Sequence, residues 1–412
     1  MLAAAKLKDL ELKWAFAYPE AIRARSQPAV LGDTLFVGSQ NGSVFAIDKH
    51  RGCIKWTFST IAQVRTGIVA GDDGVLYFGD LVGNVYAVNA ADGSLRWRDR
   101  PDEHPSLTLT AAPALADGVL YVPLSSLEVT EAADPDYACC TFQGGVAAYE
   151  AATGKQLWKG RTIDVPPRIV GRNSVATPRI APSGAPVWNT PSIDRKRGLL
   201  YVFTGENYSS PANSFSDAIV ALRLDTGAIA WHRQMTAKDA WNMGCETAER
   251  INCPPEDGPD YDFGAATIIA TDRNGRDLLL AGQRSGHVHA LDLDRDGELV
   301  WQRKLGKGGN PGGRALRHGQ GRTNPLRAHV GLRWRPPLAG NALPGNSRPP
   351  TVSRVRVAPW AGPRDRCRAA TCCSSTRGMA STSICPVRCC WPSVRRTENR
   401  IQAVLLVDLL LI

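Results

Sequence analysis

The sequence predicts an all-β fold, a β-propeller of four-stranded blades, and the main reason is a repeated hairpin. The stretch 144–158, GGVAAYEAATGKQLW, reads as a strand, a tight turn and a second strand that carries a tryptophan. Val146 and Ala148 alternate with their neighbours as strand residues do. Gly154 can adopt the positive φ that the turn needs, and Trp158 is a large apolar anchor.

The same spacing recurs along the chain: Val or Ile, Ala two residues later, a short turn with glycine, and then tryptophan. The copies end at Trp56, Trp97, Trp158, Trp231 and Trp301. The last copy has one extra residue in its turn, and Trp14 fits the end of a copy whose start is missing. Two further strand-like runs precede each copy, so each repeat supplies one blade. A blade cannot bury both faces alone, and the blades must therefore stack radially. A β-sandwich is the alternative.

Two insertions, a bridge and a tail interrupt or follow the repeats. Insertion 128–143 widens the third blade, and insertion 236–262 follows the fourth. The bridge 159–188 is rich in Pro and Gly, which argues against regular strands there. The hairpin pattern stops near residue 313. We therefore divide the chain into a partial propeller, residues 1–313, and a tail, residues 314–412.

The tail carries the basic charge of the chain. The formal net charge is +10, and the tail has 17 Arg, no Lys and 3 acidic residues. The repeat region is therefore mildly acidic, and we expect no nucleic-acid partner. Out-of-frame translation is the favoured interpretation of this composition. A disordered basic tail and a small Cys-rich metal module are the alternatives, and we assign the tail no function.

The cysteines of the repeat region suggest two disulfides. Cys245 and Cys253 bracket a short loop, and Cys139 and Cys140 are adjacent and could form a vicinal pair. Both pairings favour an oxidising compartment, with free cytosolic thiols as the alternative. The first residues lack the apolar run of a signal peptide. The final AVLLVDLLLI is too short to span a membrane.

Several stretches outside the hairpins resemble one enzyme family. YVPLSSLE, CCTFQGGV, TGENYS, AWNMGC and PDYDFGA are similar to polyvinyl alcohol dehydrogenase, a cytochrome-linked branch of the quinoprotein dehydrogenases. That family binds pyrroloquinoline quinone (PQQ) on an eight-bladed propeller. The resemblance covers roughly residues 12–313, where about five blades are recognisable. The repeat itself is less specific, because non-catalytic propellers of the outer-membrane assembly machinery share it.

The resemblance implies a set of cofactor-binding residues. Trp188 matches the tryptophan on which PQQ stacks, and Arg65 matches an arginine that pairs with a PQQ carboxylate. Thr108 and Thr110 are candidate hydroxyl donors. An ordinary packing tryptophan and a surface arginine are the alternative interpretations. The Cys139–Cys140 pair lies in a different blade from the vicinal disulfide of methanol dehydrogenases, so its contact with PQQ does not carry over.

The resemblance also implies a Ca²⁺ site and a catalytic base. Glu128 and Asn207 match family ligands, and with Asp262 they form the hard oxygen set that Ca²⁺ prefers. Asp262 is our candidate for the base, with Asp260 as its rival, because Asn242 in AWNMGC cannot accept a proton. Arg284 matches the cation beside the quinone oxygens, where it would stabilise negative charge on the reduced cofactor.

The resemblance implies an enzyme that uses PQQ and Ca²⁺ to oxidise secondary alcohols, including polymeric ones, to ketones. The sequence has no C-x-x-C-H haem motif, so a separate soluble cytochrome c would accept the electrons. It also lacks a Gly-rich dinucleotide fingerprint. We expect a periplasmic or secreted location from the resemblance, and His287 and His289 as packing or surface residues. A protein-binding scaffold and an inactive fragment of the enzyme are the alternatives, and we expect the chain as written to be unstable and inactive.

Overall fold

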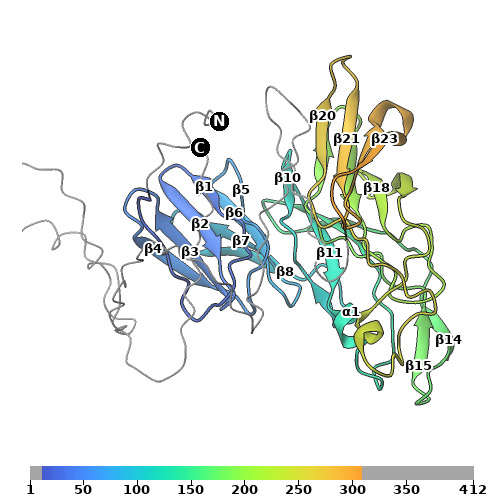
Figure 1. The fold of residues 1–412 in the computed structure, drawn as a ribbon. Coiled ribbons are helices and arrows are strands. Elements are labelled where there is room, and N and C mark those ends of the chain that lie inside the picture. Colours follow the sequence, from blue (N-terminus) through green and yellow to red (C-terminus); the bar gives the residue numbers. More distant parts are fainter. Residues whose placement is uncertain (1–11, 309–412) are drawn as a thin grey trace, which may run out of the picture. The chain divides into compact units, whose positions relative to one another are not determined.

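The computed structural model describes residues 12–308, which form five antiparallel sheets with four main strands each and one two-stranded sheet (Figure 1). In each of the five larger sheets these strands follow one another in sequence order. The sheets are β1 (Ala29–Leu31), β2 (Thr34–Gly38), β3 (Ser43–Asp48) and β4 (Ile54–Ser59); β5 (Val69–Ala70), β6 (Val75–Gly79), β7 (Val85–Asn89) and β8 (Leu95–Asp99); β10 (Ala114–Ala116), β11 (Val119–Ser126), β12 (Gly145–Glu150) and β13 (Gln156–Arg161); β16 (Ser192–Asp194), β17 (Leu199–Phe203), β18 (Ala218–Arg223) and β19 (Ile229–Gln234); β20 (Ile268–Thr271), β21 (Asp277–Gly282), β22 (His287–Asp292) and β23 (Glu298–Lys304). The predicted all-β fold of four-stranded blades is confirmed. The predicted tail, 314–412, lies outside the described residues.

The repeated hairpin is the third and fourth strand of each of these five sheets. In each copy the tryptophan pairs directly with the alanine of the preceding strand, for example Ala46 with Trp56 and Ala148 with Trp158. A β-bulge follows that pair in all five copies. A bulge bends the strand locally and re-aims its side chains. The regular sequence spacing thus has a regular structural counterpart, which we call the docking hairpin.

Each docking hairpin receives a tryptophan from the hairpin before it. The turn glycines Gly52, Gly93, Gly154, Gly227 and Gly297 all have positive φ, and a Cβ on any of them would come within 3.0 Å of an indole ring. The rings are those of Trp14, Trp56, Trp97, Trp158 and Trp231, in that order. Glycine is therefore needed twice over, for the backbone conformation and for the close approach. Trp14 occupies the position predicted for the end of a hairpin.

Four of these five tryptophans also donate a hydrogen bond to the hairpin on which they pack. Their Nε1 atoms bond to the carbonyls of Lys49, Ala90, Ala151 and Leu224, at 2.8–3.1 Å. Each carbonyl lies three residues before the turn glycine. The fifth, Trp231, has a buried Nε1 with no partner among residues 12–308. Its target turn contains the extra residue and the short 3₁₀ helix η3 (Leu293–Arg295), which displaces the equivalent carbonyl.

The bridge between the third and fourth sheets contains a strand pair that the sequence did not predict. β14 (Arg168–Arg172) and β15 (Pro178–Ala181) form a two-stranded antiparallel sheet. The prediction of an irregular bridge was wrong. Long-range contacts stabilise this pair. The Ile180 N–H donates to the Cys139 carbonyl, and the Cys140 N–H donates to the Ile180 carbonyl. The Asn173 side chain also donates a hydrogen bond to that of Asn252. Tertiary pairing therefore overrides the weak local propensity.

The insertions add little regular structure. Strand β9 (Leu107–Thr108) pairs with the end of β11, and the short helix α1 (Glu128–Glu131) follows β11. Insertion 236–262 contains only the 3₁₀ helix η2 (Met243–Glu246). Both predicted disulfides are present, Cys139–Cys140 and Cys245–Cys253. In the described part of the chain no helix has the length and apolarity to cross a membrane.

Candidate functional site

The predicted site residues lie at equivalent places in successive sheets. One group of these residues precedes the first of the four main strands of a sheet: Arg65, Thr108, Trp188 and Asp262. The other group follows the second main strand: Glu128, Asn207 and Arg284. Backbone hydrogen bonds join these positions in series: Asp80 to Leu109, Leu124 to Val187, Pro186 to Gly205, and Asp262 to Arg284. We call the stretches that contain these seven residues, before the first or after the second main strand of a sheet, the site segments. Residues far apart in sequence are therefore brought into adjacent positions by one repeated architectural rule.

Three carboxylates converge where the site segments of the fourth and fifth sheets meet. Oxygen atoms of Glu206, Asp260 and Asp262 all lie within 4.8 Å of one another. All three side chains are buried, with Asp262 6% exposed. The backbone N–H of Glu206 donates to Asp262 Oδ1 at 3.1 Å. We call these three residues the acid cluster.

Arg284 is the cation of this site. Its Nη1 lies 2.5 Å from Asp260 Oδ1 and 3.5 Å from Asp262 Oδ2. Its backbone N–H also donates to the Asp262 carbonyl at 2.9 Å. The structure thus brings together the two predicted catalytic residues, Asp262 and Arg284, and also the predicted rival, Asp260.

One arginine does not balance three buried carboxylates, and the pKa values show this. Burial, and then the charge of Asp262, raise the pKa of Glu206 well above its ordinary value. The same two causes raise the pKa of Asp260 to about 9. Burial raises the pKa of Asp262 as well, while the hydrogen bond with Glu206 and the charge of Arg284 oppose that rise. These shifts favour the protonated form of carboxyl groups in the acid cluster.

The acid cluster fits a metal ion. Glu206 Oε2 is buried and has no hydrogen-bond partner among residues 12–308. A buried carboxylate oxygen without a donor costs free energy, and a divalent cation would satisfy it. Carboxylate oxygens are the ligands that Ca²⁺ prefers. The sequence pointed to Asp262 and Asp260 here, but Glu206 was not among the predicted ligands.

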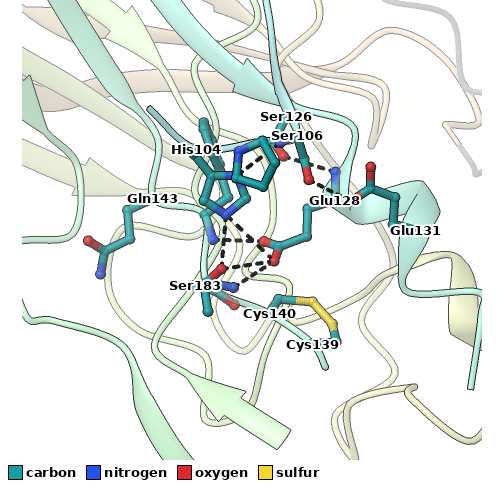
Figure 2. A network of polar contacts seen from close by, with 12 residues as sticks. His104, Ser106, Ser126, Glu128, Glu131, Cys139, Cys140, Gln143 and Ser183 are labelled. Carbon is teal, nitrogen blue, oxygen red and sulfur yellow. Dashed lines mark hydrogen bonds and ion pairs between the residues drawn. A yellow bond between two sulfur atoms is a disulfide. The ribbon is translucent and has the colours of Figure 1, made fainter. Parts of the chain in front are cut away.

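Glu128, the predicted Ca²⁺ ligand, lies in a separate hydrogen-bond network (Figure 2). Its Oε1 accepts from Tyr137 Oη at 3.0 Å and from the Thr141 N–H at 2.7 Å, and its Oε2 accepts from the Phe142 N–H at 2.7 Å. These donors lie within two residues of the Cys139–Cys140 pair in the sequence. Glu128 is fully buried and is not a member of the acid cluster. Here it anchors the loop that carries the disulfide.

Asn207 is adjacent to the acid cluster through Glu206, but its side chain already has partners. Oδ1 accepts from the Asn213 N–H at 2.7 Å, and Nδ2 donates to the Ser183 carbonyl at 3.2 Å. The amide oxygen keeps a second lone pair that could bind a cation. Asn242, by contrast, caps η2 and donates to the carbonyls of Tyr208 and Asn252, which is a structural role.

The predicted PQQ-binding residues include several buried polar atoms without partners. Thr108 Oγ1, Thr110 Oγ1 and Trp188 Nε1 are buried and form no hydrogen bond within residues 12–308. Unpaired donors in adjacent site segments fit a ligand with several oxygen atoms, such as a quinone tricarboxylate. Arg65 lies beside Arg23 and Arg25 around a small cavity. Burial and the charge of Arg25 lower its pKa, so this group of cations also favours an anionic ligand.

The histidines of the fifth sheet are not part of this site. His289 is buried, and its ring lies 5.9 Å from that of Phe263. Burial lowers its pKa to about 4, so the ring is neutral at physiological pH. His287 hydrogen-bonds with Ser285. The predicted packing role agrees with these contacts.

Comparison with known proteins agrees with this architecture. The family model described as "Glucose/ethanol/alcohol dehydrogenase, beta-propeller domain" matches residues 102–261, and that of "Outer membrane protein assembly factor BamB" matches residues 8–168. A polyvinylalcohol dehydrogenase of a Pseudomonas species is 36% identical over 319 residues, which is 76% of this chain and 49% of that protein. These matches show that the chain is related to the quinoprotein alcohol dehydrogenases over about three quarters of its length.

A second polyvinylalcohol dehydrogenase, from Sphingopyxis sp. (strain 113P3), is 37% identical over 321 residues, again 76% of this chain and 49% of that protein. The chain therefore spans about half the length of these curated relatives. Solved quinohemoprotein alcohol dehydrogenases of Pseudomonas putida HK5 and Comamonas testosteroni both have a TM-score of 0.56, at 21% and 22% identity. The two structural alignments cover 72% and 73% of this chain, and 44% and 46% of the respective solved chains. They support the propeller fold.

Proposed function

We propose that this chain is the substrate-oxidising propeller region of a PQQ- and Ca²⁺-dependent alcohol dehydrogenase. The observation that carries the proposal is the acid cluster. The carboxyl groups of Glu206, Asp260 and Asp262 lie together there, and Glu206 Oε2 is buried with no hydrogen-bond partner among residues 12–308. Such an arrangement is costly in a purely structural propeller. The substrate class, secondary and polymeric alcohols, comes from the named relatives and from the sequence resemblance.

The residues of the chain suggest how the reaction is organised. When bound, PQQ supplies the two-electron acceptor and Ca²⁺ supplies a Lewis acid. Thr108, Thr110, Trp188 and Arg65 would hold the cofactor. Glu206 and Asp262 would hold the cation, with Asn207 contributing its free lone pair and Glu128 as a further candidate ligand.

Asp262 is the proposed general base. It must be ionised to take the hydroxyl proton of the alcohol, and burial works against that. Arg284, at 3.5 Å, and the Glu206 N–H, at 3.1 Å, both favour the ionised form. Arg284 also places a positive charge where negative charge develops as the alcohol loses its proton and hydride. Asp260 forms the shorter ion pair with Arg284 and would keep the guanidinium in place.

Electron acceptor and location complete the proposal. The electrons would leave to a soluble cytochrome c. A periplasmic or secreted location is supported by two disulfides, which form in oxidising compartments.

The proposal is tested by measuring how PQQ binds to the purified full chain, using fluorescence titration with and without Ca²⁺. We expect Ca²⁺-dependent binding, and dye-linked oxidation of a secondary alcohol in any preparation that turns over. At saturating PQQ and Ca²⁺, Asp262→Asn should lower the rate by about 10²-fold or more, because it removes the base. Full activity in Asp262→Asn would refute the base assignment.

A protein-binding scaffold is the second candidate function, and the match of residues 8–168 to the BamB model favours it. A scaffold needs the docking hairpins but not the acid cluster. Absence of Ca²⁺-dependent PQQ binding would support the scaffold.

A further inference from the structure

The loop that carries Asp260 and Asp262 lacks regular secondary structure and has a strained backbone. Residues 258–262 contain no helix or strand. Asp260 has a φ of 52°, and Asp257 has a φ of 46°. This left-handed region is unfavourable for residues other than glycine. The conformation that places Asp260 in the acid cluster must therefore be stabilised by contacts from elsewhere.

Asp239 makes those contacts. Its side chain is fully buried. Oδ1 accepts from the Asp260 N–H at 3.3 Å, and Oδ2 accepts from the Tyr261 N–H at 3.0 Å. Both carboxylate oxygens of Asp239 thus accept hydrogen bonds from the loop, at the two peptide groups that flank the Cα atom of Asp260. Hydrogen bonds from backbone N–H groups to a carboxylate are stronger than those between neutral groups.

Gly258 permits this approach. A Cβ at Gly258 would overlap Asp239 Oδ1, so any larger residue would push the loop and Asp239 apart. The Gly258 N–H also donates to the Ala240 carbonyl at 3.0 Å. The loop is therefore held along one side by residues 239 and 240.

The same aspartate also fixes the other side of the acid cluster. The Asp239 carbonyl accepts from the Asn207 N–H at 3.1 Å and from Ser216 Oγ at 2.6 Å. Asn207 follows Glu206 directly, so Asp239 connects the segment of Glu206 with the segment of Asp260 and Asp262. We propose that Asp239 is the positioning residue that holds these two segments at the separation a cation requires. The cation is the part of this inference that rests on the proposed function.

Asp217 provides a matched control. It is a fully buried aspartate whose side chain interacts with that of Asp239 and makes no hydrogen bond to residues 258–262. Its charge lies near that of Asp239, Asp260 and Asp262. Asp217→Asn and Asp239→Asn therefore make the same isosteric change from a carboxyl group to an amide beside the cluster. They differ in that only Asp239 bonds to the 258–262 loop.

The experiment measures amide hydrogen exchange and Ca²⁺ affinity in the full chain. In Asp239→Asn we expect the amides of Asp260 and Tyr261 to exchange at least tenfold faster, and Ca²⁺ to bind at least tenfold more weakly, than in Asp217→Asn. Equal exchange rates in the two variants would overturn the positioning role, whatever Ca²⁺ does. Faster exchange with unchanged Ca²⁺ affinity would overturn its connection with the cluster.

Two further comparisons keep the outcomes distinct. If the unmodified chain binds no Ca²⁺, the proposed function fails, while the exchange rates still decide whether Asp239 holds the loop. If Asp239→Asn does not fold, Gly258→Ala disturbs the same contact from the loop side, and Gly171→Ala, with open space around it, is its control. Faster exchange at Asp260 and Tyr261 in Gly258→Ala alone supports the inference, and equal exchange in both glycine variants contradicts it.

Discussion

The docking hairpins and the site segments differ in how they treat buried polar groups. In four of the five occupied docking hairpins the tryptophan N–H has a carbonyl partner. In the site segments, by contrast, Thr108, Thr110, Trp188 and Glu206 each have a buried polar atom with no partner in residues 12–308. An unpaired buried group costs about 1–3 kcal/mol. The comparison teaches that the hairpins are built for stability and the site segments for binding.

The largest expected effect concerns the protons of the acid cluster. The pKa of Asp260 is raised from 3.8 to about 9, so between those values the folded chain binds more protons than the unfolded chain. Its free energy of unfolding should therefore fall as the pH rises from about 4 to about 9, by up to about 1.4 kcal/mol per pH unit for one proton. Urea denaturation at pH 5, 7 and 9 measures this slope.

Asp260→Asn should reduce that slope, because the amide does not titrate. Saturating Ca²⁺ should reduce it as well, since the cation replaces the protons. A slope that is the same in Asp260→Asn and in the unmodified chain would show that the site segments are not under electrostatic strain.

The next effect tests the docking hairpins. Gly154 has a φ of 74°, and a Cβ there would lie 2.5 Å from Trp97. Gly154→Ala should lower the free energy of unfolding by about 3 kcal/mol, from backbone strain and steric overlap together. Gly118, with a φ of 76° and nothing within 4 Å, is the matched control, and its alanine variant should lose only about 1 kcal/mol. Equal losses by urea denaturation would mean that the tryptophan contact is unimportant.

A pair of threonines contrasts a buried hydroxyl that has hydrogen-bond partners with one that has none. Thr108 Oγ1 has no partner in the described chain, whereas Thr66 Oγ1 donates to the Gly79 carbonyl and accepts from its N–H. Thr66→Val should destabilise the protein by about 2 kcal/mol, and Thr108→Val should leave it unchanged or stabilise it by about 1 kcal/mol. Thermal unfolding without cofactor measures both.

The same Thr108→Val variant should bind PQQ about tenfold more weakly if its hydroxyl donates to the cofactor. Unchanged PQQ affinity would remove Thr108 from the binding site.

The smallest effect distinguishes one docking hairpin from the others. Trp97 Nε1 donates to the Ala151 carbonyl at 2.8 Å, whereas Trp231 Nε1 has no partner in the described chain. Trp→Phe at either position removes a similar volume, but only Trp97→Phe also breaks a hydrogen bond. We expect Trp97→Phe to cost about 1 kcal/mol more than Trp231→Phe. Denaturant midpoints measure the difference, and a larger loss at Trp231 would contradict the explanation from the extra turn residue.

The sequence by itself determined the blades and their docking, because the spacing of Ala, Gly and Trp is local and repeats. The family resemblance, rather than this spacing, singled out Arg284, Asp262 and Trp188, and the structure places them in the site segments next to strand ends. Only the tertiary structure decided which carboxylates meet. Glu206 joins Asp260 and Asp262, whereas Glu128 binds the disulfide loop, because the folding of both insertions sets these distances. Asp239 and the β14–β15 pair were missed for the same reason: contacts between residues far apart in sequence give them their roles, and no local spacing encodes those contacts.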